Sequence, residues 1–273
     1  MNNKPNTLDE LTEEEFLELV LQEKEKALAE AKQRRLNGTP APKKTRPIVK
    51  IAVWLMALTL IFNTFAIIFN MYSIPAIDFL QASSKLSTQE DIQMYKKAVV
   101  TVSTDSSKGT GFAISDDGYI ITNEHVIEDA LSVTVVFPND GLYEAQVIAA
   151  YEEVDLAILK VEGTTEFPYL ELAEEASFER DEAVYFIGNP LYFTGIANEG
   201  TVLDYSTASD IQTDIIMMDA PVYKGNSGSP VINKDGVVIG VVFATGKRND
   251  FGRVGLFIPV DELLTRLPEQ FTP

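Results

Sequence analysis

The sequence predicts an all-β domain that follows two helical segments. About a dozen short stretches of β-branched and aromatic residues alternate with turn residues across positions 98–268. Residues 51–77 contain no charged side chain, and residues 7–36 carry the capping and charge pattern of a helix. Strands this short and this numerous favour an antiparallel sandwich or barrel.

The composition alone excludes several kinds of catalytic and binding site. The chain has 273 residues, a formal net charge of −19, no cysteine and a single histidine, His125. The absence of cysteine excludes disulfides, thiol catalysis and Cys/His zinc sites. The acidic balance argues against nucleic-acid binding. Any mechanism that needs an imidazole must therefore use His125.

Residues 1–50 are predicted to form a cytoplasmic amphipathic helix and a Pro-containing basic linker. Thr7 and Thr12 each begin a capping-box pattern, and Asn37-Gly38 supplies a stop signal. Acidic residues crowd the start of the segment and basic residues its end, as the helix dipole favours. A solvated spacer or a coiled-coil helix is the simpler interpretation, and a dedicated partner-binding helix is the alternative.

Residues 51–77 are predicted to form one transmembrane helix that contacts the lipid bilayer. At about 1.5 Å per residue, this uncharged run is longer than the ~30 Å hydrocarbon core. A cleaved signal peptide is the competing interpretation, but about 50 hydrophilic residues precede the run. Four Lys or Arg residues lie between positions 43 and 50, and Asp78 follows the run. The positive-inside rule therefore predicts a single-pass protein of the cell membrane, with a cytoplasmic N-terminus and an extracytoplasmic C-terminal domain.

Residues 78–97 are predicted to be a linker with a possible short helix, residues 98–268 the β domain, and residues 269–273 a tail. A brief helix is expected after Pro259. The predicted strands, separated by turn signals such as Asp117-Gly118 and Asp235-Gly236, are 98–103, 111–115, 119–122, 132–137, 145–150, 156–161, 183–187, 200–203, 215–217, 231–232, 237–243 and 254–258.

One turn carries the residue types that serine acyl transfer requires. Such chemistry needs a hydroxyl, a base, a group that orients the base, and amides that stabilise an oxyanion. In the segment 224–230, glycines flank Ser227 and permit a tight turn that would expose its hydroxyl and aim the amides of Gly225 and Ser227 at one point. A plain Gly/Ser turn between strands is an equally good interpretation of this segment taken alone.

The base and its orienting group have candidates at strand ends. His125 follows the predicted strand 119–122, and Asp155 directly precedes the strand 156–161. A partly buried Asp155 would need a hydrogen-bond donor, and a histidine N–H is suitable. The alternatives are a surface or core histidine and an exposed turn aspartate. Asp116, Asp117 and Asp129 are weaker candidates because they lie in turns or a polar helix.

Chain order restricts the fold that such a triad would occupy. An α/β-hydrolase needs a histidine after its serine, and none follows Ser227. The subtilisin order, Asp then His then Ser, would need helices alternating with a parallel sheet. The order His, Asp, Ser remains, which is that of chymotrypsin.

Five motifs in this order resemble the bacterial HtrA/Deg branch of trypsin-like serine proteases. They are GTGF (109–112), TNEHV (122–126), DLAILKV (155–161), IGNP (187–190) and GNSGSP (225–230). The resemblance covers about residues 90–268 and implies two six-stranded β-barrels of the chymotrypsin type.

The resemblance also implies roles for particular residues. It makes His125 the general base, Asp155 its orienting group and Ser227 the nucleophile. It implies that the oxyanion hole is formed by Gly225, Asn226 and Ser227. It also implies that the strand that pairs with the substrate includes Phe243, Ala244 and Thr245. Polypeptide substrates are expected, with no metal or organic cofactor and no nucleic-acid partner. A homotrimer is expected by family analogy only.

Three departures from the family pattern affect what is expected. Ser229 stands where the family usually has a second glycine, no PDZ module follows the β domain, and Asn226 stands where digestive proteases have an aspartate. Activation by N-terminal cleavage and regulation by a bound peptide tail are therefore not expected. By count before Ser227, the floor of a trypsin-like pocket falls near Pro221, and no acidic residue occupies that position, so we expect a modest apolar P1 preference. A catalytically weak scaffold or sensor that acts through its N-terminal helix is the alternative to an endopeptidase.

Overall fold

The computed structural model describes residues 13–38, 47–163, 166–190, 193–208, 211–248, 250–268 and Phe271. The predicted helix start at 7–12, the helix-breaking segment 39–42 and most of the predicted tail lie outside the described residues.

The first helix, α1 (Glu13–Leu36), ends within one residue of the predicted stop. The side chains described along it, from Phe16 onward, are exposed. Leu19, Val20 and Leu21 are consecutive and therefore leave the helix in different directions. The apolar surface of α1 is thus not the single stripe expected from an amphipathic helix.

The second helix, α2 (Pro47–Leu86), includes the uncharged run. Its segment Pro47–Phe65 has a mean hydropathy of 1.9 and is long and apolar enough to cross a membrane. The last turns of α2 pack on the β domain, where the Ala197 amide donates a hydrogen bond to Ser83 Oγ (3.1 Å) and Leu86 is buried. A short helix, α3 (Glu90–Ala98), follows and leads directly into the first strand. The stretch that the sequence predicts to be a linker is therefore largely helical.

The first barrel is a closed six-stranded antiparallel sheet with the strand order β1-β2-β3-β6-β5-β4. The short helix α4 (Glu124–Ile127) follows β3, and the 3₁₀ turn η2 (Glu152–Val154) precedes β6. The strands are β1 (Val99–Ser103), β2 (Lys108–Ala113), β3 (Tyr119–Thr122), β4 (Val133–Phe137), β5 (Gly141–Tyr151) and β6 (Leu156–Val161).

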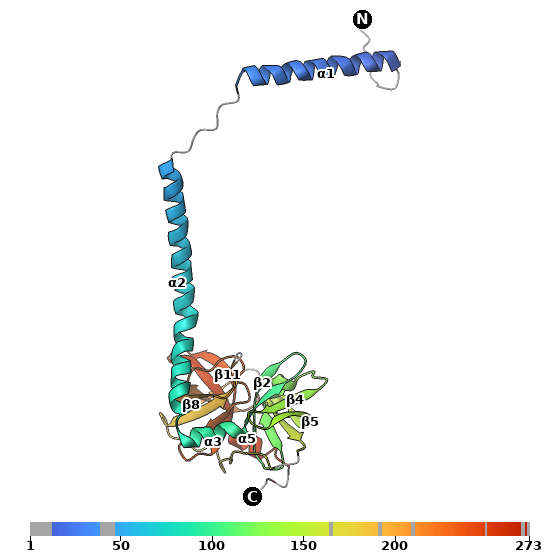
Figure 1. Ribbon diagram of the computed structural model, residues 1–273. Helices are drawn as coiled ribbons and strands as arrows, with labels where there is room; N and C mark the ends of the chain where they lie inside the picture. Colours follow the sequence, from blue (N-terminus) through green and yellow to red (C-terminus); the bar gives the residue numbers. More distant parts are fainter. Residues whose placement is uncertain are drawn as a thin grey trace. The chain divides into compact units, whose positions relative to one another are not determined.

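The second barrel repeats this design with the strand order β10-β11-β12-β9-β8-β7, and α5 (Val260–Leu264) follows its last strand. Figure 1 shows the two groups of strands, with β2, β4 and β5 in one and β8 and β11 in the other. The strands are β7 (Ala183–Gly188), β8 (Ile196–Thr207), β9 (Asp214–Asp219), β10 (Pro230–Ile232), β11 (Val238–Arg248) and β12 (Gly252–Pro259).

Each barrel has its own apolar interior, and a further core joins them. Val135 and Leu159 lie inside the first barrel, and Phe186 and Ile216 lie inside the second. The joining core contains residues of both barrels together with Leu86 of α2 and Ile92 of α3. Burial of this shared apolar surface holds the two barrels in contact, so groups on both can meet at one site.

All twelve predicted strands are present in the described part of the chain. The double-barrel fold implied by the resemblance is confirmed, as is the brief helix after Pro259. The strands β5, β8 and β11 are longer than predicted because polar and glycine-containing stretches at their ends continue the pairing.

Candidate active site

His125 lies in α4, which begins two residues after β3 ends. The residue between them, Asn123, is fully buried, and its side-chain amide donates a hydrogen bond to the Asp155 carbonyl (2.8 Å). This bond joins the end of β3 to the beginning of β6. His125 and Asp155 are 30 residues apart in the sequence, and the Asn123 bond brings their backbones together.

Asp155 has a left-handed backbone conformation, with φ of 52°, at the end of η2. Aspartate is one of the few residues besides glycine that tolerate this region. Its Oδ2 lies 2.8 Å and its Oδ1 2.9 Å from His125 Nδ1, and the His125 backbone amide also donates to Oδ1 (3.0 Å). With 13% of its side-chain surface exposed, the carboxylate is held by the backbone N–H and Nδ1 of His125, and it orients the ring.

The surroundings of His125 set its protonation equilibrium. Burial by itself would lower the pKa of the imidazole. The hydrogen bond and charge of Asp155, with smaller effects of Glu124 and Glu128, outweigh burial, so the pKa of His125 is raised above its ordinary value. The pKa of Glu124 is raised as well, by burial and by the neighbouring carboxylates of Glu128, Asp155 and Glu152.

The loop that carries Ser227 begins with a tight turn. The Asn226 amide donates to the Tyr223 carbonyl (3.0 Å), and Gly225, the third residue of that turn, has a φ of 99°. A positive φ at this position is the signature of a type II turn and requires glycine. The sequence around Ser227 therefore specifies the turn through Gly225.

Three backbone amides in this loop donate hydrogen bonds to carbonyl groups. The amides of Asn226, Gly228 and Ser229 donate to the carbonyls of Tyr223, Val242 and Asn226, at 2.8 to 3.0 Å. Within the described part of the chain, the amides of Gly225 and Ser227 have no acceptor. These are the two amides that the sequence leads us to expect in an oxyanion hole. Asn226 lies between them, but its amide is already bonded.

Thr110, on β2 of the first barrel, holds this loop in place. Its backbone amide donates to the Ser227 carbonyl (2.8 Å), and its hydroxyl donates to the Gly225 carbonyl (2.7 Å). The same hydroxyl accepts a bond from the Asn189 amide (2.9 Å), and the Thr110 carbonyl accepts one from the Thr122 hydroxyl (2.7 Å). Thr110 is fully buried, so each of these polar groups depends on its protein partner.

Thr110 and Asn189 have functional positions that the sequence reasoning did not assign. Asn189 follows β7, and its side-chain amide donates across to the Val100 carbonyl of the first barrel (2.8 Å). Both residues occur in the motifs GTGF and IGNP, which carry the family resemblance. The resemblance was therefore a usable signal, although only the fold reveals that these motifs meet.

Among the described residues, the Ser227 hydroxyl makes no hydrogen bond to His125. It donates instead to the Phe243 carbonyl at 3.2 Å. The two halves of the site nevertheless meet at Gly109: a Cβ atom there would lie 2.7 Å from Val126, the residue after His125, and 3.2 Å from the Ser227 carbonyl. The structure thus pairs His125 with Asp155 and brings Ser227 to the same region, while the bond between His125 and Ser227 stays a prediction.

Phe243, Ala244 and Thr245 lie on β11 beside the Ser227 loop. The pairing of β11 with β12 shifts between Val242 and Ala244, so Phe243 is the extra residue of a β-bulge. On its other edge β11 pairs with β10 only as far as Val241. Ala244 and Thr245 therefore present a strand edge that no other described strand covers.

Several buried polar atoms in and near the Ser227 loop lack partners among the described residues. They include both side-chain amide atoms of Asn226 and the hydroxyl of Ser229. Both side chains crowd Gly188, where a Cβ atom would lie 2.3 Å from Ser229 Oγ and 2.5 Å from Asn226 Oδ1. Gly188 is thus required because a side chain there would displace the support of the Ser227 loop.

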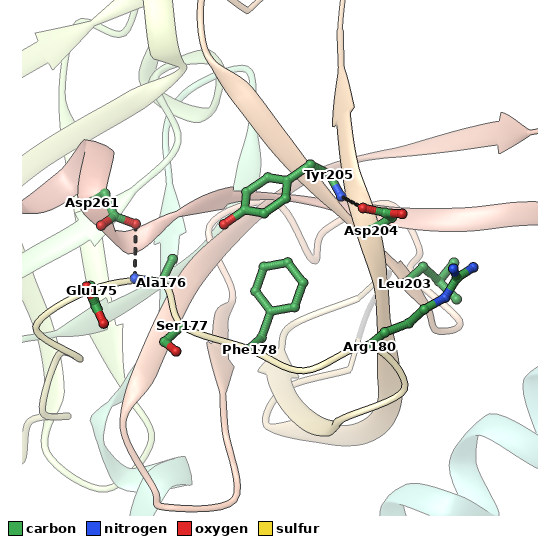
Figure 2. Close-up of a pocket in the computed structure, with 9 residues that line it drawn as sticks. All are labelled: Glu175, Ala176, Ser177, Phe178, Arg180, Leu203, Asp204, Tyr205 and Asp261. Atoms are coloured by element: carbon green, nitrogen blue, oxygen red, sulfur yellow. Dashed lines mark hydrogen bonds between the residues drawn. The ribbon is translucent and has the colours of Figure 1, made fainter.

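A separate pocket lies on the second barrel, between the 175–180 segment, β8 and α5 (Figure 2). Asp261 accepts a bond from the Ala176 amide (3.0 Å), and the Phe178 and Tyr205 rings are 5.1 Å apart. The pocket contains none of the three candidate triad residues. Its lining includes Ser177 but neither histidine nor lysine, the bases that most often activate a serine. No group of three or more metal-binding side chains occurs within the ranges that the structure describes.

Comparison with known proteins agrees with this arrangement. Residues 109–241 match the family described as trypsin-like peptidase domain. These residues therefore form a trypsin-like peptidase domain, and the relatives they resemble are named as HtrA and DegP-like serine proteases. The chain is 37% identical over 139 residues to the human serine protease HTRA4, and 39% identical over 137 residues to a probable periplasmic serine endoprotease DegP-like from Bartonella henselae.

These matches concern the protease domain. They cover 49% of this chain in each case, and 29% and 27% of the length of the two relatives. Among solved structures, the Rv3671c protease from M. tuberculosis in its active form matches with a TM-score of 0.59 and 28% identity, over 67% of this chain and 84% of that one. The inactive form of the same protease matches about as well, with a TM-score of 0.58. The fold of the domain is therefore similar to that of both forms.

Proposed function

We propose that this protein is a membrane-tethered serine endopeptidase that hydrolyses peptide bonds in unfolded or exposed protein segments. One observation carries the proposal: the Asp155 carboxylate is hydrogen-bonded to Nδ1 of the only histidine in the sequence. Nε2 is therefore the ring nitrogen that is free to accept a proton. In a trypsin-like peptidase domain, that proton would come from Ser227.

The proposed reaction uses the triad in two steps. Ser227 Oγ attacks the substrate carbonyl while its proton passes to His125 Nε2, and Asp155 stabilises the imidazolium. The amides of Gly225 and Ser227 donate to the oxyanion. The C–N bond then breaks, and the amine leaves with the proton from Nε2. Water, deprotonated by His125, attacks the acyl-serine ester, which releases the carboxylic acid product and restores Ser227.

Substrate binding would also release the nucleophile. An extended peptide added to the edge of β11 would pair with the backbone of Phe243, Ala244 and Thr245. A substrate N–H that bonds to the Phe243 carbonyl would compete with the Ser227 hydroxyl, which now occupies this acceptor. Rotation of a serine side chain is fast, so the freed hydroxyl would turn toward His125 without rearrangement of the barrels.

The helix before the domain supports the proposed tether. The apolar segment Pro47–Phe65 follows a run of basic residues, and the positive-inside rule then favours a cytoplasmic N-terminus. The Bartonella relative is named as periplasmic, which is compatible with a protease domain on the outer side.

An active-site serine phosphonate tests the proposal on the full chain in detergent micelles. We expect the wild type to be labelled and Ser227→Ala to be unlabelled. Ser177→Ala, which removes an exposed serine of the separate pocket, serves as the matched control and should label normally. His125→Ala should lower turnover of a denatured protein substrate by about 10⁴-fold or more. A wild type that neither labels nor cleaves would favour a catalytically inactive scaffold.

A further inference from the structure

A second pocket lies beside the Gly225 turn, on the side of the first barrel. Its lining consists of the β1–β2 hairpin turn, the beginning of β2 and the turn before Ser227, namely Thr104, Asp105, Ser106, Ser107, Lys108, Lys224 and Gly225. Gly225 carries one of the two free amides next to the nucleophile. Any group bound in this pocket would therefore lie next to the proposed oxyanion hole.

The wall of the pocket is an ordered part of the fold. The Thr104 amide donates to the Ser107 carbonyl (2.9 Å), and the Ser107 amide donates to the Thr104 hydroxyl (2.9 Å). These bonds close the hairpin turn, and Ser103 pairs with Lys108 at its base. The pocket is thus shaped before any substrate arrives.

Strand geometry directs Lys108 toward this pocket. Side chains two residues apart on a strand emerge on the same face. The Thr110 hydroxyl reaches the Gly225 carbonyl (2.7 Å), whereas a side chain on the intervening Gly109 would point at Val126. Lys108 therefore emerges on the face where the Gly225 turn lies, and Lys224 belongs to that turn.

The charged groups beside Gly225 differ from those around His125. Lys108 and Lys224 are exposed and make no ion pair within the described ranges, and Asp105 is the one carboxylate that lines the pocket. The electrostatic neighbours of His125 are instead Asp155, Glu124 and Glu128. In a chain with a net charge of −19, two unpaired lysines beside the nucleophile form a local attraction for a carboxylate.

The contacts around Ser227 give the direction in which a substrate would cross the site. On one side, the Ser227 hydroxyl contacts Phe243 of β11. On the other side, the Gly225 carbonyl contacts Thr110, two residues from Lys108. If the acyl part of the substrate lies along β11, as in the proposed function, the leaving part continues past Gly225 to the lysine pocket.

We propose that the lysine pocket binds an acidic side chain on the C-terminal side of the scissile bond. This inference rests on the proposed function and adds a substrate preference to it. A carboxylate in the pocket can accept charge-assisted hydrogen bonds from the two ammonium groups. Because both lysines are exposed, we expect a preference of about threefold to tenfold in kcat/KM for Glu over its neutral isostere Gln.

Paired internally quenched peptides test the preference with the full chain in detergent micelles. A cleavable sequence is first selected from a peptide library by mass spectrometry. Peptides with Glu, Gln or Lys at each of the three positions after the cleaved bond are then compared. The ratio of kcat/KM for Glu over Gln peptides should fall to about one in Lys108→Gln/Lys224→Gln and should invert in Lys108→Glu/Lys224→Glu. It should also fall with added salt in the wild type.

Lys234→Gln provides the matched control, since Lys234 is an exposed lysine in the turn between β10 and β11. This variant should keep the wild-type ratio. A wild type that labels with the phosphonate and cleaves peptides without preferring Glu would overturn the lysine pocket and leave the proposed function intact. The same holds if the double Gln variant retains the preference. A wild type that neither labels nor cleaves overturns both.

Discussion

At the residue scale, Thr110 connects the two barrels at the Ser227 loop. Its hydroxyl donates to the Gly225 carbonyl, a residue 115 positions away, and accepts from Asn189, while its amide donates to the Ser227 carbonyl. The hydrogen bond from Thr110 fixes the orientation of the Gly225 carbonyl. This bond stabilises the turn that leaves the amides of Gly225 and Ser227 free. Thr110 is therefore a positioning residue for the proposed oxyanion hole.

Thr110→Val removes the hydroxyl but keeps the shape of the side chain. We expect it to lower kcat about 10- to 100-fold with little change in KM, because a misplaced oxyanion donor weakens transition-state binding. Thr110→Ser should restore kcat. Steady-state kinetics and the rate of phosphonate labelling measure the effect. Thr122→Val is the matched control, since it deletes a buried hydroxyl of the same network that does not reach Gly225. Equal losses of kcat in Thr110→Val and Thr122→Val would argue for general destabilisation instead.

The raised pKa of His125 predicts the acid limb of the pH profile. A general base must be neutral, so activity is lost as pH falls through the pKa of His125 in the folded protein. Glu124 contributes to raising this pKa, after the larger opposing effect of burial and the effects of Asp155. Glu124→Gln should therefore lower the pKa and move the acid limb of kcat/KM to lower pH, on the order of a few tenths of a unit. Glu144→Gln on β5 should leave the limb unchanged, and a shift to higher pH in Glu124→Gln would contradict the assignment.

At the scale of the element, the turns around Ser227 depend on left-handed glycines. Gly228 follows Ser227 with a φ of 85°, and a Cβ atom there would lie 1.9 Å from the Thr110 carbonyl oxygen. Such an approach leaves no space for any side chain. The close packing of β2 against the Ser227 loop therefore requires glycine for two reasons, its backbone conformation and its lack of a side chain.

Two glycines with similar backbone conformations allow the cost of backbone strain and the cost of the steric clash to be measured separately. Gly252 begins β12 with a φ of 74°, and a Cβ atom there would meet nothing within 4 Å. Gly252→Ala should cost about 1 kcal/mol in the free energy of unfolding, from backbone strain alone. Gly228→Ala should cost about 3 kcal/mol or more, because the steric clash adds to the strain. Urea denaturation followed by far-ultraviolet circular dichroism measures both, and equal costs would show that a small shift of the Ser227 loop relieves the clash with Thr110.

At the scale of the whole molecule, the chain combines an apolar helix with an acidic protease domain. The Pro47–Phe65 segment is uncharged apart from Lys50 and has a mean hydropathy of 1.9. After residue 77, Asp and Glu residues outnumber Lys and Arg residues. An acidic, soluble domain joined to a membrane-spanning helix would be confined to the membrane surface. The predicted trimer would add further contacts, and it stays a prediction.

Leu58→Lys/Ile61→Lys, placed in the middle of the apolar segment, tests the tether. Each lysine near the centre of a membrane helix opposes insertion by about 3 kcal/mol. We expect the double variant to be extracted from membranes by alkaline carbonate, whereas the wild type stays in the membrane fraction. Leu28→Lys in α1, which lies at an exposed position, should behave like the wild type. Retention of the double variant in the membrane after carbonate treatment would rule out this segment as the anchor.

The sequence by itself determined the local features of this protein. Alternating apolar residues and turn residues predicted all twelve strands, because strand formation and turn chemistry depend on neighbours within a few positions. The single histidine restricted the base to His125, and chain order restricted the fold. The lengths of β5, β8 and β11 were underestimated, since pairing with a partner strand extends polar stretches that the local pattern does not mark.

The tertiary structure decided which of these local features meet. The bonds from Asp155 to His125, and from Thr110 to Gly225 and Ser227, join residues 30 and more than 100 positions apart. Such contacts depend on how two barrels close and pack, and a local pattern carries no record of that. The resting bond from Ser227 to the Phe243 carbonyl and the position of Lys108 beside Gly225 are of the same kind. Burial then makes the contacts within the barrels obligatory, because a polar group removed from water must find its partner in the fold.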